Sequence, residues 1–233
     1  MATEILAQIP RSLISSMFVA SVAFFVATWL VPVLTTRQLH LKIIAFLAVW
    51  YGLVVLLGKT EFFALNPLFL PNIIFAFVLI GLMIKVLYSL PSLKILSETI
   101  PPQWLIGLQI FRVMGIGFLS FYNLGLIPGE FAIPTAWGDV FIGATAPFVA
   151  FALAKGYGFA KKLAIGWNYL GIADLAMAIF LGIVTFPRPF QFLPTEPTNL
   201  PIGLFPLVVV PCFAVPLSAM IHLFTLRELK KQK

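Results

Sequence analysis

Long apolar segments dominate this sequence and limit it to very few kinds of fold. A helix needs about 20 apolar residues to cross the hydrocarbon core of a bilayer, because each residue adds a rise of ~1.5 Å. Charged residues make up only 10% of the chain, whereas an ordinary soluble domain has about 25%. We therefore expect an all-α, polytopic membrane bundle of about seven transmembrane helices, at approximately 12–35, 42–58, 68–88, 103–123, 135–155, 163–186 and 203–226.

The predicted spans form one domain, residues 1–233, because no linker or low-complexity tract divides the chain. The second span is short, with 16 uncharged residues between Lys42 and Lys59. These two lysines must therefore extend toward the membrane interfaces. The first apolar run has no basic region followed by a clear cleavage site, so we expect it to be retained as a span.

The distribution of cations predicts the orientation. The formal net charge is +7, yet Lys and Arg lie singly at the ends of apolar segments and form no patch for nucleic acid. Three cations outside the spans lie on one side, namely Arg11, Lys59 and Arg188, and eleven lie on the other. The positive-inside rule then places the amino terminus outside and the carboxyl terminus in the cytoplasm.

Prolines are concentrated in two segments between residues 186 and 217. The outer connection "FPRPFQFLPTEPTNLP" (186–201) cannot form a helix interior, and we expect an extended cap over the outer mouth. In "FPLVVVPCFAVPL" (205–217), each proline removes an amide donor and frees a carbonyl four residues earlier, so the last helix should be bent or broken. Broken helices bind ions in some transporters, but prolines are also frequent in membrane helices generally.

Polar side chains inside the membrane are concentrated in the last four predicted spans. A buried polar group without a partner is costly, so intramembrane polar residues are candidate binding residues. The candidates are Gln109, Arg112, Asp139, Asn168, Asp174 and His222.

Arg112 and Asp174 are the central pair of this set. Each lies about ten residues along a span that runs outward from the cytoplasm, so both should lie near mid-depth and could meet. One interpretation is a buried ion pair that only sets helix register. The other makes Arg112 a binder of anions and Asp174 a protonatable partner. Gly115 and Gly171 would let the neighbouring backbones approach closely.

Asp139 and His222 have simpler interpretations. Asp139 should lie in the first turn of a span entering from outside, where a carboxylate satisfies free amides and the helix dipole. His222 should lie about one turn from the inner end of the last span, and a hydrogen-bonded histidine is favoured over a haem ligand because no haem motif accompanies it.

The sequence gives no sign of a cofactor or a metal. Cys212 is the only cysteine, which excludes an intramolecular disulfide and a thiolate-cluster metal site. The spans also lack the spaced His and Glu residues of a di-iron carboxylate site. We therefore expect no cofactor and no bound metal.

Four segments together resemble a known family. They are "LQIFRVMGIGFL", "IPGEFAIPTAWGDVFIG", "WNYLGIADLAMAIFLG" and "FPLVVVPCFAVPLSAMIHLFTLREL". They resemble small bacterial multi-span membrane proteins without an assigned function, over roughly residues 103–229. The resemblance implies an integral protein of the bacterial inner (cytoplasmic) membrane. It implies no activity. It does not cover the first spans, whose prediction rests on hydropathy alone. It groups Arg112, Asp139, Trp167, Asn168, Asp174 and His222.

Three classes of function stay open. The first is a transport or binding protein for an ion or a small polar or anionic molecule, with a polar cavity among the last four helices. The second is an intramembrane enzyme acting on a lipid or isoprenoid, with Asp174 or Asp139 as general acid. Arg112 argues against Asp174 in that role, because a nearby cation favours the ionised carboxyl. The third is a structural subunit of a larger membrane complex, with membrane lipids as its surroundings. The first class is our leading hypothesis.

Overall fold

The computed structural model describes residues 37–64, 78, 81, 85, 100–187 and 191–231, with side chains in the first range described from Ala45 onward. These residues form helices and turns and contain no strand, which confirms the all-α prediction for this part of the chain. The elements are α3 (Arg37–Lys59), η2 (Phe62–Ala64), α6 (Pro102–Leu108), η3 (Gln109–Ile116), α7 (Gly117–Asn123), α8 (Gly129–Ala154), α9 (Ala160–Val184), η4 (Leu200–Gly203), η5 (Val210–Ala214) and α10 (Val215–Lys231).

Four helices in the described residues are long and apolar enough to cross a membrane. They are the continuous α6–η3–α7 helix (Pro102–Asn123), α8, α9, and η5 with α10 (Val210–Lys231). They correspond to the last four predicted spans. Of the first three predictions, 42–58 falls within α3, whose segment Ala45–Lys59 is apolar. The span 12–35 and nearly all of 68–88 lie outside the described residues.

Two predicted helix starts are wrong. α8 begins at Gly129 rather than 135, after Pro128 in an extended conformation. Hydropathy discounts Glu130, although a carboxylate is favourable in the first turn of a helix. The last long helix begins at Val210 rather than 203, because residues 204–208 form a bend and a turn that contains Pro206.

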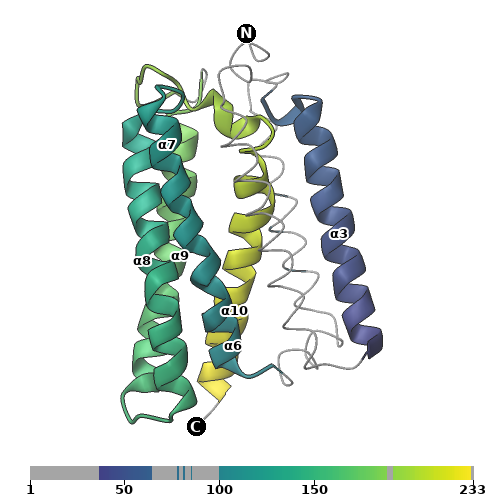
Figure 1. Ribbon diagram of the computed structural model, residues 1–233, viewed down its shortest axis with the longest axis vertical. Coiled ribbons are helices and arrows are strands. Elements are labelled where there is room, and N and C mark those ends of the chain that lie inside the picture. Colours follow the sequence, from purple (N-terminus) through teal and green to yellow (C-terminus); the bar gives the residue numbers. More distant parts are fainter. Residues whose placement is uncertain are drawn as a thin grey trace.

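The four long helices alternate in direction. α6–η3–α7 and α9 run toward the end where η4 and the connection before it lie, and α8 and α10 run back (Figure 1). α10 lies between α3 on one side and the other three long helices on the other (Figure 1). In the most apolar stretch of η5 with α10, 61% of the residues are buried, about twice the share of 28–33% in the other three long helices. α10 is therefore the central helix of the described part.

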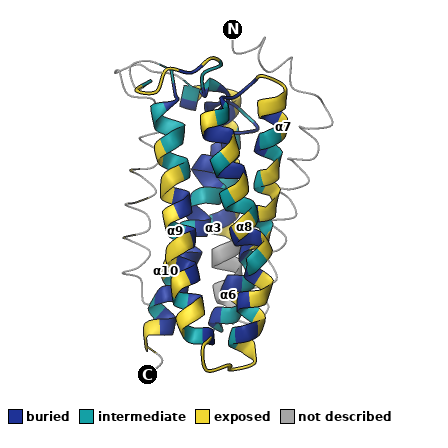
Figure 2. Ribbon diagram, turned by 90° about the vertical axis from the view of Figure 1, so that its left-hand side faces the viewer, coloured by how far each residue is buried: buried dark blue, intermediate teal, exposed yellow. Residues whose placement is uncertain are grey.

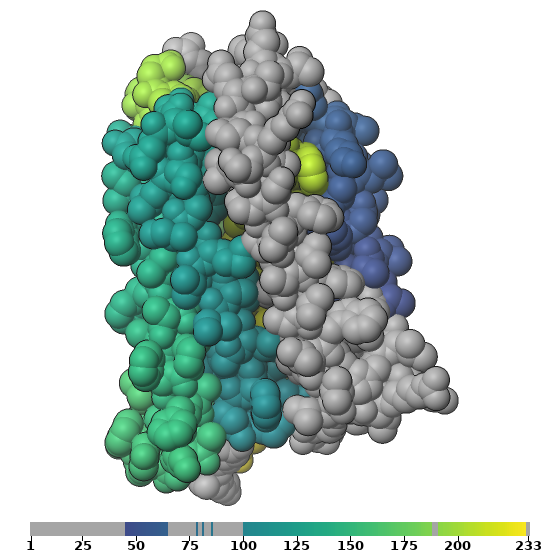
Figure 3. All heavy atoms as spheres, viewed as in Figure 1, coloured from purple at the N-terminus to yellow at the C-terminus, as the bar shows by residue number. Residues whose placement is uncertain are grey.

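The outward surface of the bundle is apolar. α8 exposes Phe141, Phe148 and Phe151, and α9 exposes Phe180. Exposed residues follow the outward sides of the long helices while buried residues face inward (Figure 2). α6, α7 and α8 form one continuous surface on the face seen in Figure 3. Helices that are apolar on both sides suit a lipid environment.

The break predicted in the last helix is present. A π-helical turn, η5, precedes α10 and contains Pro211. Further along, Pro216 has no amide hydrogen to offer the carbonyl of Cys212. The indole of Trp50 donates to that carbonyl instead, at 3.1 Å. A tryptophan in the middle of α3 thus donates a hydrogen bond to a backbone carbonyl of η5, just before α10.

Candidate functional site

Arg112 lies at the centre of a buried charged cluster. It is carried by η3, between α6 and α7, and is only 3% exposed. Its Nε donates to Oδ1 of Asp139 at 2.7 Å, and its Nη2 donates to Oδ2 of Asp174. The expected meeting of Arg112 with Asp174 is therefore present. One guanidinium also holds a second carboxylate, so η3 is tied to both α8 and α9.

The prediction for Asp139 is wrong. Because α8 begins at Gly129, Asp139 lies ten residues into the helix, where no free amides of a first turn remain. The error follows from the predicted start at 135. The carboxylate faces the bundle interior and pairs with Arg112.

A directional chain of hydrogen bonds extends from Arg112 to α10. Nη1 of Arg112 donates to the carbonyl of Gly171 at 3.4 Å and lies 3.3 Å from Nε2 of His222. Because a guanidinium has only donors, Nε2 must be the acceptor and the ring proton lies on Nδ1. Nδ1 then donates to Oδ1 of Asn168 at 2.9 Å, and Nδ2 of Asn168 donates to the carbonyl of Ala164 at 2.7 Å. This pattern requires a neutral His222.

Gln109 forms a separate buried pair with Ser218. Its Nε2 donates to the carbonyl of Ser218 at 3.1 Å, and Oγ of Ser218 donates back to Oε1 at 2.7 Å. The other five candidate residues are joined through Arg112. Sequence analysis did not single out Ser218, although its position four residues before His222 places both on one face of α10.

Glycines allow the helices to approach at this cluster. A Cβ atom at Gly115 would collide with the side chain of Asp139, and one at Gly171 would collide with the ring of His222. Both glycines were expected to allow close approach. Sequence analysis missed two others, Gly138 against the carboxylate of Asp174, and Gly143, where a Cβ would lie 2.5 Å from the amide nitrogen of Val113.

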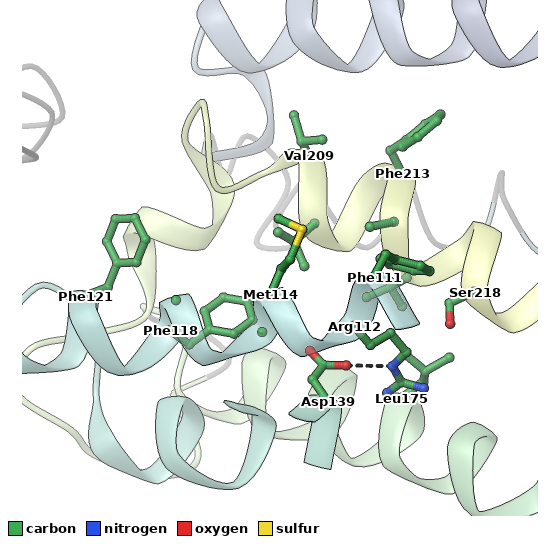
Figure 4. A pocket seen from close by; sticks show the side chains of 15 residues that line it. Phe111, Arg112, Met114, Phe118, Phe121, Asp139, Leu175, Val209, Phe213 and Ser218 are labelled. Atoms are coloured by element: carbon green, nitrogen blue, oxygen red, sulfur yellow. Dashed lines mark hydrogen bonds and ion pairs between the residues drawn. The ribbon is translucent and has the colours of Figure 1, made fainter. Parts of the chain in front are cut away.

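A cavity of about 110 Å³ lies beside the cluster, between η3 with α7 and η5 with α10 (Figure 4). A polar cavity among the last four helices was predicted, but of the six candidate residues only Arg112 and Asp139 lie on the wall of this one. Gln109, Asn168, Asp174 and His222 are bonded within the bundle instead. A smaller cavity of about 50 Å³ shares Asp139 and continues toward Phe186 and η4.

Comparison with known families places this chain. The model of a family described as Domain of unknown function (DUF8737) matches residues 68–230. The chain belongs to this family. The DUF8737 match includes all six candidate residues and the four long helices, and it leaves α3 outside. No curated protein and no solved structure matches the chain. The DUF8737 description assigns no activity, so the chemistry must come from the site itself.

Formal charges show what the cluster can bind. Arg112 contributes one positive charge, ionised Asp139 and Asp174 contribute two negative charges, and His222 is neutral, so the sum is one negative charge. An uncompensated charge in a bundle interior costs several kcal/mol. Across the described residues, no group of three or more His, Cys, Asp or Glu side chains is placed to hold a metal ion. The cluster is therefore suited to take up one proton or one monovalent cation.

Proposed function

We propose that this DUF8737 protein is an integral membrane transport or binding protein whose last four helices hold a site for one proton or one small cation. Asp139 and Asp174 would share the bound charge, and Arg112 would hold the two carboxylates in place. The observation that carries this proposal is that a buried carboxylate, Asp174, and a partly buried one, Asp139, share a single guanidinium beside a cavity.

The same geometry favours a cation over the anionic ligand considered from the sequence. Nε and Nη2 of Arg112 already donate to carboxylates, and Nη1 already has two partners. An anion bound there would add a second uncompensated negative charge to the bundle interior, whereas a proton or cation would neutralise the first.

The proposal includes seven spans, an outer amino terminus, a cytoplasmic carboxyl terminus and a bacterial inner membrane. The charges of the described helix ends support this orientation. One end of the bundle carries cations of the α8–α9 turn and of the end of α10, and Lys59 lies at the other end (Figure 1). The first end carries Lys155, Lys161, Lys162, Lys230 and Lys231.

Flux measurements in vesicles test the proposed function. The full chain is reconstituted into liposomes that contain a pH-sensitive dye or, in parallel, a sodium-sensitive dye, and a potassium gradient with valinomycin makes the interior negative. We expect proton or sodium influx above that of protein-free vesicles, and we expect Asp139→Asn and Asp174→Asn to abolish it. Glu228→Gln is the matched control, because Glu228 pairs with Lys231 at 2.8 Å near the end of α10, away from the cluster.

A structural subunit is the second candidate, favoured by one observation. Gln109, Asn168 and His222 have hydrogen-bond partners within the bundle, as a helix-joining network requires. This function would give no flux of either cation in vesicles. The enzyme hypothesis gains no such support, because both carboxylates are engaged by Arg112.

A further inference from the structure

The cavity beside Arg112 is largely apolar, with four phenylalanines on its walls, and its charged groups are the carboxylate of Asp139 and the guanidinium of Arg112. Phenylalanine rings line both of its walls, Phe111 and Phe118 from η3 and α7, and Phe213 from η5. Ser218 also lines the cavity, but its hydroxyl donates to Gln109. Apart from Asp139, such walls offer few polar ligands in exchange for the water of a small hydrated ion. The walls favour a ligand with an apolar body.

Asp139 supplies the negative charge at this cavity. One of its oxygens accepts from Nε of Arg112, and the other lies on the side of Phe118 and Met114 (Figure 4). A cationic group next to Asp139 would neutralise the excess negative charge of the cluster. The faces of aromatic rings also attract cations that lie within about 6 Å of the ring centre.

The volume limits the size of the ligand. An apolar cavity of about 150 Å³ accepts benzene, and the cavity here is about 110 Å³. The smaller volume limits the apolar body of a ligand to at most a single small ring or a short branched chain, with the charged group at the edge of the cavity.

We propose that this cavity binds a small lipophilic organic cation, an ammonium group attached to one small ring or branched aliphatic chain. The ammonium pairs with Asp139, and the apolar body lies among Phe111, Phe118 and Phe213. This inference rests on the proposed function, because the organic cation replaces the proton or inorganic cation that the acid pair otherwise takes up.

Equilibrium dialysis of the purified full chain in detergent, with radiolabelled benzylammonium as the probe and detergent alone as the blank, tests this inference. We expect saturable binding that benzyl alcohol and benzoate, of similar shape, displace poorly. Asp139→Asn should weaken binding by roughly tenfold or more, since it removes a charged partner. Glu228→Gln should bind like the natural chain.

A second variant fills the cavity and leaves the charges in place. Gly117 lies on the cavity wall, and a Cβ atom there would meet nothing within 4 Å, so Gly117→Leu should fold and block the probe. Gly166→Leu is its control, because Gly166 is equally open but does not line this cavity. Equal binding by Gly117→Leu and the natural chain would overturn the proposal.

The two proposals fail separately. Proton or sodium influx without saturable benzylammonium binding would end this inference and leave the proposed function standing. Binding that depends on Asp139, without influx of any cation, would support the ligand class and end the transport proposal. Equal displacement by benzyl alcohol would show an apolar site without charge selection and contradict this inference.

Discussion

Arg112, Asp139 and Asp174 make unequal contributions, although they belong to one cluster. Arg112 pairs with two carboxylates and balances one of their two negative charges, so its loss leaves two unbalanced negative charges in the cluster. Loss of either carboxylate leaves one ion pair with balanced charge. The usual rule that breaking a buried ion pair is severe therefore applies to Arg112 and not to the two acids.

We expect Arg112→Gln to destabilise the fold by about 3–5 kcal/mol, the range for an uncompensated buried charge. Asp139→Asn and Asp174→Asn should each cost no more than about 1 kcal/mol, the scale of a single hydrogen bond, because each also removes the excess negative charge. Unfolding of the purified variants in mixed detergent measures the difference. Combining all three substitutions should recover part of the loss. Equal losses from the three single variants would contradict the charge count.

The importance of some of these residues could be predicted, because a charged residue within an apolar run can be recognised from the sequence alone. Arg112 and Asp174 were placed at similar depth by counting along helices of known direction, and they do meet. Asp139 was misplaced because its depth depended on a helix start that hydropathy set six residues too late. The series of hydrogen bonds from Arg112 through His222 to Asn168 could not be predicted, since it depends on which sides of the helices are in contact.

Close packing at glycines holds the long helices in register around the cluster. Along α9 two glycines differ sharply in their surroundings. Gly171 lies against the ring of His222, whereas a Cβ atom at Gly166 would meet nothing within 4 Å. The pair gives a test with identical chemistry at two positions of one helix.

Gly171→Ala should destabilise the fold by about 1–3 kcal/mol, because the new methyl group must displace the His222 ring and its hydrogen bonds to Arg112 and Asn168. Gly166→Ala should be neutral or stabilising by up to ~1 kcal/mol, since alanine favours the helix. Thermal unfolding midpoints of the two variants in one detergent check this. A loss at Gly166 as large as that at Gly171 would exclude the packing explanation.

The elements were predicted to different degrees. The proline spacing predicted a broken last helix, because a missing amide hydrogen is a property of the residue alone. It did not predict a π-helical turn at Val210–Ala214. It also could not predict that Trp50 donates to the carbonyl of Cys212, since that contact needs the position of α3 relative to α10.

At the scale of the whole molecule, orientation is the main open prediction. A reporter that works only in the cytoplasm should be active when fused after Lys233 and inactive when fused at Glu4, because the cation-rich helix ends favour the cytoplasmic side. Activity of the fusions in bacterial cells measures this. The reverse pattern would invert the assignment, and equal activity at both ends would require an even number of spans.

Hydropathy located the last four spans because each is close to the thickness of a bilayer and bounded by polar residues. It could not show that α10 is central and the other three more peripheral, since the four helices are similarly apolar. Whether a helix is central depends on how many neighbouring helices it contacts, and the average hydropathy of one helix does not contain this information.

The bond between Trp50 and Cys212 has a consequence for biosynthesis. The two residues are 162 positions apart, so the indole leaves the ribosome long before its acceptor is made. α3 is therefore made with an indole donor that has no permanent partner, and η5 is made later with a carbonyl to which Pro216 offers no amide hydrogen. Neither helix reaches its final state alone, and the last long helix to be translated is the one that completes the first described helix.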